Sequence, residues 1–291
     1  MIPNELYPEI IKAGAFTAVL CLMFSAGLRM APSHLMYLRD KPALLIRSLL
    51  AVIVLVPIAA LLIVFILRPS DKAAAGLAIL ASSPAAPLML LRVSKASGKI
   101  DYIASLHFSL TLLSIIATPI TLALMSRALG FSASVEPVQI ALLVLRIVIL
   151  PVGLGIALRL RFPVAAERIA LPLSRFGWIV LALMMLLVLP LTIRFILEME
   201  ISSYAAIIAF LVSALAIGHF SVPEHSGERT ALALEAAGRN PGFALVIAQL
   251  NFPPDKAVPF LIPYLIVFMV LSAAYIIWRK RTAGKAESSK S

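Results

Sequence analysis

Length, composition and charge already restrict the kind of protein that this sequence encodes. The chain has 291 residues, of which 62% are hydrophobic and 13% are charged, and its mean hydropathy is +1.03. Soluble domains average about 45–50% apolar and about 25% charged residues, so a soluble protein is excluded and an integral membrane protein is predicted. The net charge of +11 comes without a nucleic-acid-binding motif, and we therefore assign it to basic loops on the cytoplasmic side of a membrane.

The sequence carries no pattern of an enzyme. It has no phosphate-binding loop, no nucleophile elbow and no cluster of metal ligands. We therefore predict no catalytic activity, no cofactor, no metal and no ATP-driven pump. The single cysteine, Cys21, excludes a disulfide within the chain.

Apolar runs of helical length recur along the chain and predict an all-α membrane fold, without the alternating pattern of a barrel. The third and eighth of these runs are interrupted. Short loops indicate one transmembrane domain, 1–278, followed by a basic tail, 279–291, that we expect to lack regular structure. The nine predicted transmembrane helices lie at about 9–30, 42–67, 72–97, 100–126, 136–160, 173–194, 202–222, 229–251 and 256–278.

The distribution of basic residues predicts the orientation in the membrane. Of the 25 lysines and arginines, 16 fall in loops on one side, six on the other and three within spans. Because basic loops stay in the cytoplasm, the N-terminus is expected outside and the C-terminus inside. Short loops and simple termini favour a bacterial inner membrane.

The two interrupted helices form a weak internal repeat. Alignment of Pro84 with Pro241 sets residues 77–91 against 234–248, and both stretches are apolar and broken by small residues and proline. Two broken helices of opposite direction, one in each half, are typical of transporters built from inverted repeats. Two merely kinked helices in a bundle are the alternative, since proline is common in membrane helices. The predicted breaks comprise Ser83, Pro84, Ala85, Ala86 and Pro87 in the third helix and Gly238, Pro241 and Gly242 in the eighth.

Charged and polar residues gather at the second break. Glu235 and Arg239 are four residues apart in an apolar segment, where charges are expensive and commonly functional. They form either an internal ion pair or part of a transport site. Asn240 precedes Pro241 and is expected to cap a second half-helix, whose positive end favours an anion. Alternatively, Asn240 only bonds carbonyls that the break sets free.

His107 lies in the predicted fourth helix. The ordinary pKa of histidine, about 6.5, makes it a candidate proton carrier. A single membrane histidine can equally be a hydrogen-bonded packing residue.

Four stretches resemble the bile acid:sodium symporter family. The resemblance covers most of the chain in order, and it implies a panel domain and a core domain, with two unwound helices crossing in the core. The stretches are 22–28, similar to Met-Phe-x-x-Gly-Leu, then Val56-Pro57, then Ser83-Pro84-Ala85-Ala86, similar to Cys-Pro-Gly-Gly, and 235–240, similar to Glu-x-Gly-x-Gln-Asn. The implied panel helices are those at about 9–30, 136–160 and 173–194, and the implied core helices are those at about 42–67, 72–97, 100–126, 202–222, 229–251 and 256–278.

The chain departs from the family where the family binds its two sodium ions. Glu235 matches the shared acidic ligand. The other ligand positions fall at Met89, Leu90, Ile103, His107, Val52 and Arg239. Hard cations require oxygen ligands, so both sodium sites are expected to be lost.

These observations predict a secondary transporter of a small or amphipathic organic anion, which works by alternating access in the lipid bilayer. It is expected not to use the family's sodium sites and to be proton-coupled or a uniporter. Glu235, Arg239, Asn240 and His107 are the candidate substrate or coupling residues. Two alternatives stay open: a sodium-coupled symporter with one rebuilt sodium site, and a sensor or scaffold that transports nothing.

Overall fold

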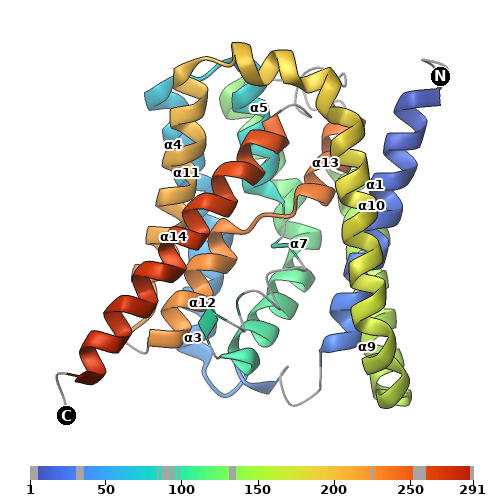
Figure 1. The fold of residues 1–291 in the computed structure, drawn as a ribbon, viewed down its shortest axis with the longest axis vertical. Coiled ribbons are helices and arrows are strands. Elements are labelled where there is room, and N and C mark those ends of the chain that lie inside the picture. The colour runs from blue at the N-terminus through green and yellow to red at the C-terminus, as the bar shows by residue number, and fades with distance from the viewer. Residues whose placement is uncertain are drawn as a thin grey trace.

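A computed structural model folds the chain into a bundle of long helices (Figure 1). The structure describes residues 6–30, 36–83, 85–86, 93, 96–97, 99–130, 136–223, 226–251 and 260–288. Two of these described residues, Ala85 and Arg239, form an isolated bridge outside any strand. The helices are α1 (Leu6–Arg29), α3 (Pro42–Leu50), η1 (Ala51–Leu55), α4 (Val56–Leu67), α5 (Asp71–Ser82), α7 (Ile100–Leu129), α8 (Pro137–Val144), η2 (Leu145–Ile149), α9 (Leu150–Arg161), α10 (Pro163–Glu198), α11 (Ile201–Phe220), α12 (Ser226–Ala237), α13 (Pro241–Asn251) and α14 (Leu261–Ser288).

Seven described helical stretches are long and apolar enough to cross a membrane, which confirms the predicted all-α membrane fold. They are Glu9–Arg29, Pro42–Leu67, Ile100–Leu129, Pro137–Arg161, Pro163–Pro190, Ile201–Phe220 and Leu261–Thr282. The other two predicted spans are the interrupted ones. The first part of 72–97 forms α5, and 229–251 divides into α12 and α13. The total of nine stays a prediction, because most of 84–98 lies outside the described residues.

Two helices extend beyond their predicted ends. Helix α10 begins at Pro163 rather than near 173, because proline at the first helical positions costs no hydrogen bond. Helix α14 continues to Ser288, so the expectation that the tail lacks regular structure from 279 onward is wrong. Its arginine, lysine, alanine and glutamate residues are good helix formers, which outweighs their polarity.

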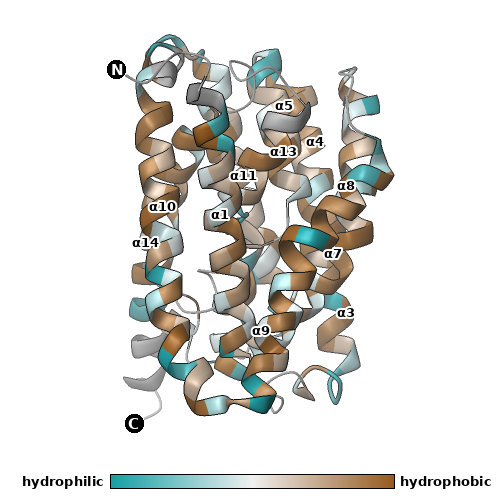
Figure 2. Ribbon diagram, turned by 90° about the vertical axis from the view of Figure 1, so that its right-hand side faces the viewer, coloured by the Kyte–Doolittle hydropathy of each residue, from teal (hydrophilic) through white to brown (hydrophobic). Residues whose placement is uncertain are grey.

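Hydrophobic residues predominate along the helices of the bundle (Figure 2), and large ones are exposed on its outside. Leu62, Phe65 and Ile116 are each more than half exposed, as expected of side chains that face lipid tails. The interior uses small residues instead. Every residue of α5 from Ala73 to Ser82 is buried, and a Cβ on Gly76 would come within 2.5 Å of the Phe260 ring. Small residues let helices approach closely in a bilayer, so α5 can run through the middle of the bundle.

A π-helical turn, η1, sits in the middle of the span Pro42–Leu67 and frees one backbone carbonyl. Within this turn the hydrogen bonds shift by one residue, so the N–H of Val56 bonds the carbonyl of Ala51. The next residue, Pro57, has no N–H to offer to the carbonyl of Val52. The Val52 carbonyl therefore needs another donor, and it finds one at the second break of the chain, as described below.

Helix α1 packs against α9 and α10 through glycines. A Cβ added to Gly155 of α9 would overlap the carbonyl oxygen of Phe24 and lie 2.9 Å from the Cα of Gly27. The backbones of α1 and α9 therefore touch at this crossing. By contrast, a Cβ on Gly153 of the same helix would meet nothing within 4 Å.

We expect Gly155→Val to destabilise the protein through this contact. The added side chain forces α1 and α9 apart, and overpacking of this kind costs about 1–3 kcal/mol. Gly153→Val makes the same chemical change on the same helix where there is room. Melting temperatures of the two variants in detergent test the contact: Gly155→Val should melt well below Gly153→Val, and equal values would show that α1 and α9 do not meet here.

Candidate functional site

The two helix breaks meet in the middle of the bundle and satisfy each other's backbone groups. The N–H of Ala86 donates to the carbonyl of Gly238 at 2.9 Å, and Ala85 and Arg239 form the antiparallel bridge. In Figure 1 the segment between α12 and α13 lies at mid-height, close to α7. Of the residues predicted to form the first break, Pro84 and Pro87 lie outside the described residues. The described parts of the two breaks thus lie side by side.

The residues at the break ends explain why each half-helix stops there. Helix α5 ends at Ser82, and Ser83 takes an extended backbone (φ −73°, ψ 145°) while its hydroxyl bonds back to the Ile79 carbonyl. At the second break, the Asn240 side chain accepts a hydrogen bond from the N–H of Phe243 at 3.0 Å. Asn240 therefore caps α13, as predicted from the Asn-Pro order.

Tyr264 of α14 bridges the second break and was not predicted from the sequence. Its hydroxyl donates to the carbonyl of Ala237 and accepts from the N–H of Arg239, both at 2.8 Å. The side chain is fully buried. Tyrosine in an apolar span is an ordinary packing residue, so only the fold reveals that its hydroxyl serves the backbone of another helix.

The guanidinium of Arg239 ties both breaks to η1. Its Nη2 donates to the Val52 carbonyl at 3.0 Å, and its Nη1 donates to the Ser83 carbonyl at 3.2 Å. Arg239 is 4% exposed, and its Nε has no hydrogen-bond partner among the described residues. The side chain therefore stands as a buried cation on two backbone oxygens, one of them the carbonyl freed by Pro57.

Glu235 pairs with His107 rather than with Arg239. The Nδ1 of His107 lies 2.7 Å from Oε1 of Glu235, and the two residues are 1% and 0% exposed. The direct ion pair with Arg239, which the four-residue spacing allowed, is replaced by this contact, because Arg239 turns toward backbone carbonyls. The second nitrogen of His107, Nε2, and the second oxygen of Glu235, Oε2, have no hydrogen-bond partner within the described chain.

The other positions named from the resemblance carry no polar side chain. Val52 and Ile103 are buried hydrophobic residues, while Met89 and Leu90 lie outside the described residues. Gly242, at the start of α13, faces α1, and a Cβ there would lie 2.8 Å from a methyl group of Val19. The second break therefore lies against α1 as well as against the first break.

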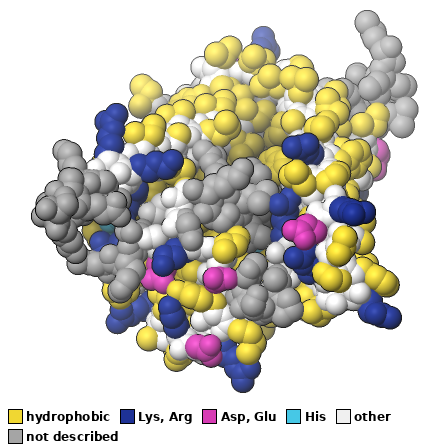
Figure 3. Space-filling model, turned by 60° about the horizontal axis from the view of Figure 1, so that its bottom comes forward, with side chains coloured by type: hydrophobic (Ala, Val, Ile, Leu, Met, Phe, Trp, Pro, Cys, Tyr) yellow, Lys and Arg dark blue, Asp and Glu magenta, His cyan; other side chains and the backbone are white. Residues whose placement is uncertain are grey.

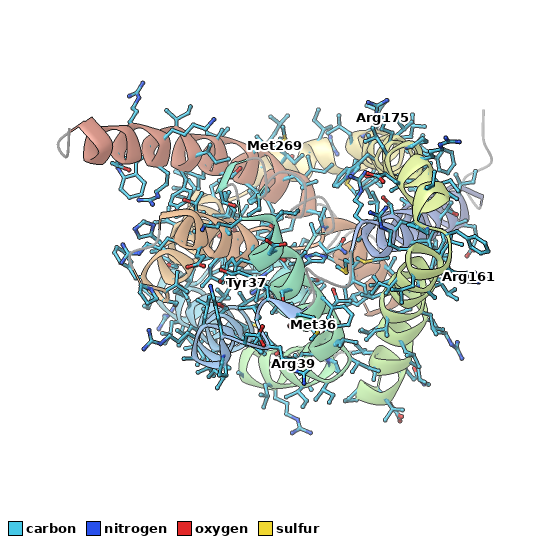
Figure 4. The ribbon with its side chains drawn as sticks, turned by 90° about the horizontal axis from the view of Figure 1, so that it is seen from below. Met36, Tyr37, Arg39, Arg161, Arg175 and Met269 are labelled. Carbon is cyan, nitrogen blue, oxygen red and sulfur yellow. The ribbon has the colours of Figure 1, made fainter. Side chains whose placement is uncertain are left out.

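A second polar cluster lies at the end of the bundle that Figure 4 shows from below, where Tyr37 is labelled. The Tyr37 hydroxyl donates to Glu228 at 2.7 Å, and Lys41 donates to the same hydroxyl at 2.7 Å. Burial raises the pKa of Tyr37, and the hydrogen bond with Tyr37 raises the pKa of Lys41. The cluster connects the segment between α1 and α3 to the first turn of α12.

Comparison with known proteins identifies one family. The Sodium Bile acid symporter family matches residues 16–199, which is more than half of the chain. The match begins within α1, continues to the end of α10 and stops before Glu235 and Arg239. Among curated proteins no match is found.

We expect Tyr264→Phe to destabilise the crossing. The substitution keeps the ring but removes two buried hydrogen bonds to the second break, at a cost of about 1–3 kcal/mol. Tyr204→Phe is the control, because the hydroxyl of Tyr204 makes one half-buried bond, to the Ile196 carbonyl. Thermal unfolding in detergent should show a clearly larger drop in melting temperature for Tyr264→Phe. A drop no greater than that of the control would show that the Tyr264 hydroxyl does not stabilise the crossing.

Proposed function

This chain belongs to the sodium bile acid symporter family, and we propose that it carries an organic anion across the membrane by alternating access, driven by protons instead of sodium. The observation that carries the proposal is the 2.7 Å contact between His107 and Glu235 in the buried core. Glu235 matches the acid that binds sodium in the family, and here a titratable base already occupies one of its oxygens.

The position of Arg239 argues against sodium at the crossing. Its guanidinium uses the carbonyl oxygens of Val52 and Ser83, which are the kind of ligand that a hard cation needs. A sodium ion would have to displace a group that is covalently fixed and carries the same charge. Two like charges a few ångströms apart in a medium of low dielectric constant repel strongly.

The charges of the cluster supply a reason for coupling a proton to an anion. With Glu235 ionised, Arg239 charged and His107 neutral, the cluster has no net charge. Protonation of His107 gives it a net charge of +1, and one monovalent anion nearby restores neutrality. Because an unbalanced charge inside a membrane protein is costly, the proton and the anion bind more favourably together than separately.

We propose α1, α8–α9 and α10 as the panel domain, and the helices around the crossing as the core. The packing of α1 on α9 and α10 supports this division. The substrate would bind between panel and core beside the breaks, where α13 faces α1, and one domain would rock against the other.

A sodium-coupled mechanism with one rebuilt site is the second candidate. Its support is Oε2 of Glu235, which is buried and has no hydrogen-bond partner among the described residues. This oxygen and nearby backbone carbonyls would have to hold the ion without the side-chain oxygens at Val52 and Ile103 that the family resemblance requires.

Uptake into proteoliposomes distinguishes the two mechanisms. Taurocholate and isethionate are suitable probes, since sulfonates stay ionised and do not leak through the bilayer when a pH gradient is imposed. We expect an inward proton gradient without sodium to drive uptake, and a sodium gradient without a pH gradient to have no effect. Uptake driven by sodium alone would favour the rebuilt site, and no uptake under either gradient would count against organic anion transport.

Variants assign the roles in the same assay. His107→Gln should abolish the response to the proton gradient, whereas His219→Gln, which changes a buried histidine bonded to Tyr275 and far from Glu235 in the hydrogen-bond network, should keep it. Arg239→Gln should lower uptake roughly tenfold or more, equal to about 1.4 kcal/mol, because the fixed charge is lost. Unchanged uptake and pH dependence in Arg239→Gln would disprove the role of the fixed charge.

We also propose that the N-terminus lies outside and that the C-terminus lies in the cytoplasm of a bacterial inner membrane. Lysine and arginine side chains are spread over the end of the molecule seen in Figure 3, which carries the start of α3 and the last turns of α14. This is the end expected to face the cytoplasm.

Thiol labelling tests the orientation. In a Cys21→Ser background, Glu200→Cys places a thiol in the loop before α11, and Ser291→Cys places one at the C-terminus. A membrane-impermeant maleimide should label Glu200→Cys on intact cells and Ser291→Cys only after permeabilisation. The reverse pattern would invert the proposed orientation.

A further inference from the structure

A small polar pocket lies beside the crossing, apart from the pair of His107 and Glu235, neither of which lines it. It is lined by η1 and α4 on one side, the end of α5 on another and α7 on the third, and its volume is about 30 Å³. That volume has room for one or two particles the size of a water molecule. Its polar lining consists of Ser82, Ser83, Ser114, Thr118, Thr121 and Arg239.

A hydrogen-bond donor without an acceptor lies at this pocket. The Nε of Arg239 has no acceptor among the described residues, and only 4% of the residue is exposed. Thr118 and Thr121 of α7 also line the pocket, and each offers a hydroxyl that can donate a hydrogen bond. A buried donor without an acceptor is unfavourable, so the Nε of Arg239 favours an occupant that accepts hydrogen bonds.

One carbonyl and three hydroxyl hydrogens at the pocket wall are already used in hydrogen bonds. The Ser83 carbonyl accepts from Arg239, and the hydroxyls of Ser82 and Ser83 bond back to Ala78 and Ile79 in the last turn of α5. The hydroxyl of Ser114 likewise donates to the Thr111 carbonyl. No aspartate or glutamate is among the described residues that line the pocket. The hydroxyl oxygens can still accept hydrogen bonds, but a fixed positive charge with a free N–H disfavours a metal cation and favours a negative guest.

We propose that this pocket binds one small monovalent anion, either a halide or a carboxylate group, which is held by Nε of Arg239 and the hydroxyls of Thr118 and Thr121. The site lies beyond the proposed transport function, since an anion held here accepts a hydrogen bond from the free Nε of Arg239 whether or not the protein moves a substrate. Its size admits chloride or formate and excludes a bulky organic anion.

Thermal unfolding of the purified protein in detergent tests the site. Gluconate, which is too large for the pocket, is replaced stepwise by chloride or by formate at constant ionic strength. Ligands that bind only the folded state raise the melting temperature, so we expect a saturable rise of roughly 3 °C at ten times the dissociation constant. Thr118→Val keeps the shape of the side chain without its hydroxyl and should lose most of this rise.

Ser126→Ala is the matched control, because Ser126 is a buried hydroxyl of the same helix that is bonded to the Ala123 carbonyl and does not line the pocket. It should respond to chloride and formate as the unaltered protein does. A rise that never saturates, or one that is equal in Thr118→Val, would mean that ions act by screening and that the pocket holds water, which overturns the proposal. Since each variant is compared with itself in gluconate, a change in its basal stability does not disturb the comparison.

Competition separates the two sources of the anion. If taurocholate displaces radiolabelled formate, the pocket is coupled to the site of a transported substrate; if it does not, the anion is a resident ion. Either result leaves the binding site standing. Anion binding without uptake would disprove the transport proposal alone, and uptake without saturable anion binding would disprove the pocket alone.

Discussion

No backbone polar group can stay unpaired in the apolar interior of a membrane protein, and this constraint governs the centre of the structure. Two helical segments of this chain end or restart in the middle of the bundle. Their polar groups are satisfied by one another at Ala86 and Gly238, by the Tyr264 hydroxyl and by the Arg239 guanidinium. The crossing is therefore a small hydrogen-bonded assembly inside an apolar bundle, and the surrounding helices enclose it.

The positive charges that the crossing can hold differ in mobility: a guanidinium is attached to the chain, whereas a bound ion or proton can dissociate. Arg239 is covalently attached, and its guanidinium remains charged at any physiological pH. A bound ion in the same place could leave, whereas a covalently attached guanidinium cannot. In the proposed mechanism, the only charge of the cluster that can move is the proton shared by His107 and Glu235, and coupling therefore depends on that pair.

The sequence was informative about the crossing where local rules apply. Proline and small residues mark both breaks, the order Asn240-Pro241 predicts the cap of α13, and apolar runs predict the spans. It was less informative where partners lie far apart in the chain. The four-residue spacing allowed an ion pair of Glu235 with Arg239, whereas the fold brings His107 to Glu235 and the Val52 carbonyl to Arg239. Tyr264 carried no signal, because a single tyrosine in an apolar helix does not reveal which backbone its hydroxyl will reach.

The distance in sequence between the two breaks has a consequence for biogenesis. Arg239 is synthesised 156 residues after Ser83, whose carbonyl it bonds. At translation rates of about 5–20 residues per second, this interval lasts roughly 8–30 s. During that time the first half of the core is already leaving the ribosome with its broken helix unmatched. We therefore expect the insertion machinery to shield the first broken helix until the second has been synthesised. When Arg239 enters the bilayer, the carbonyls of Ser83 and Val52 are already present to accept its hydrogen bonds.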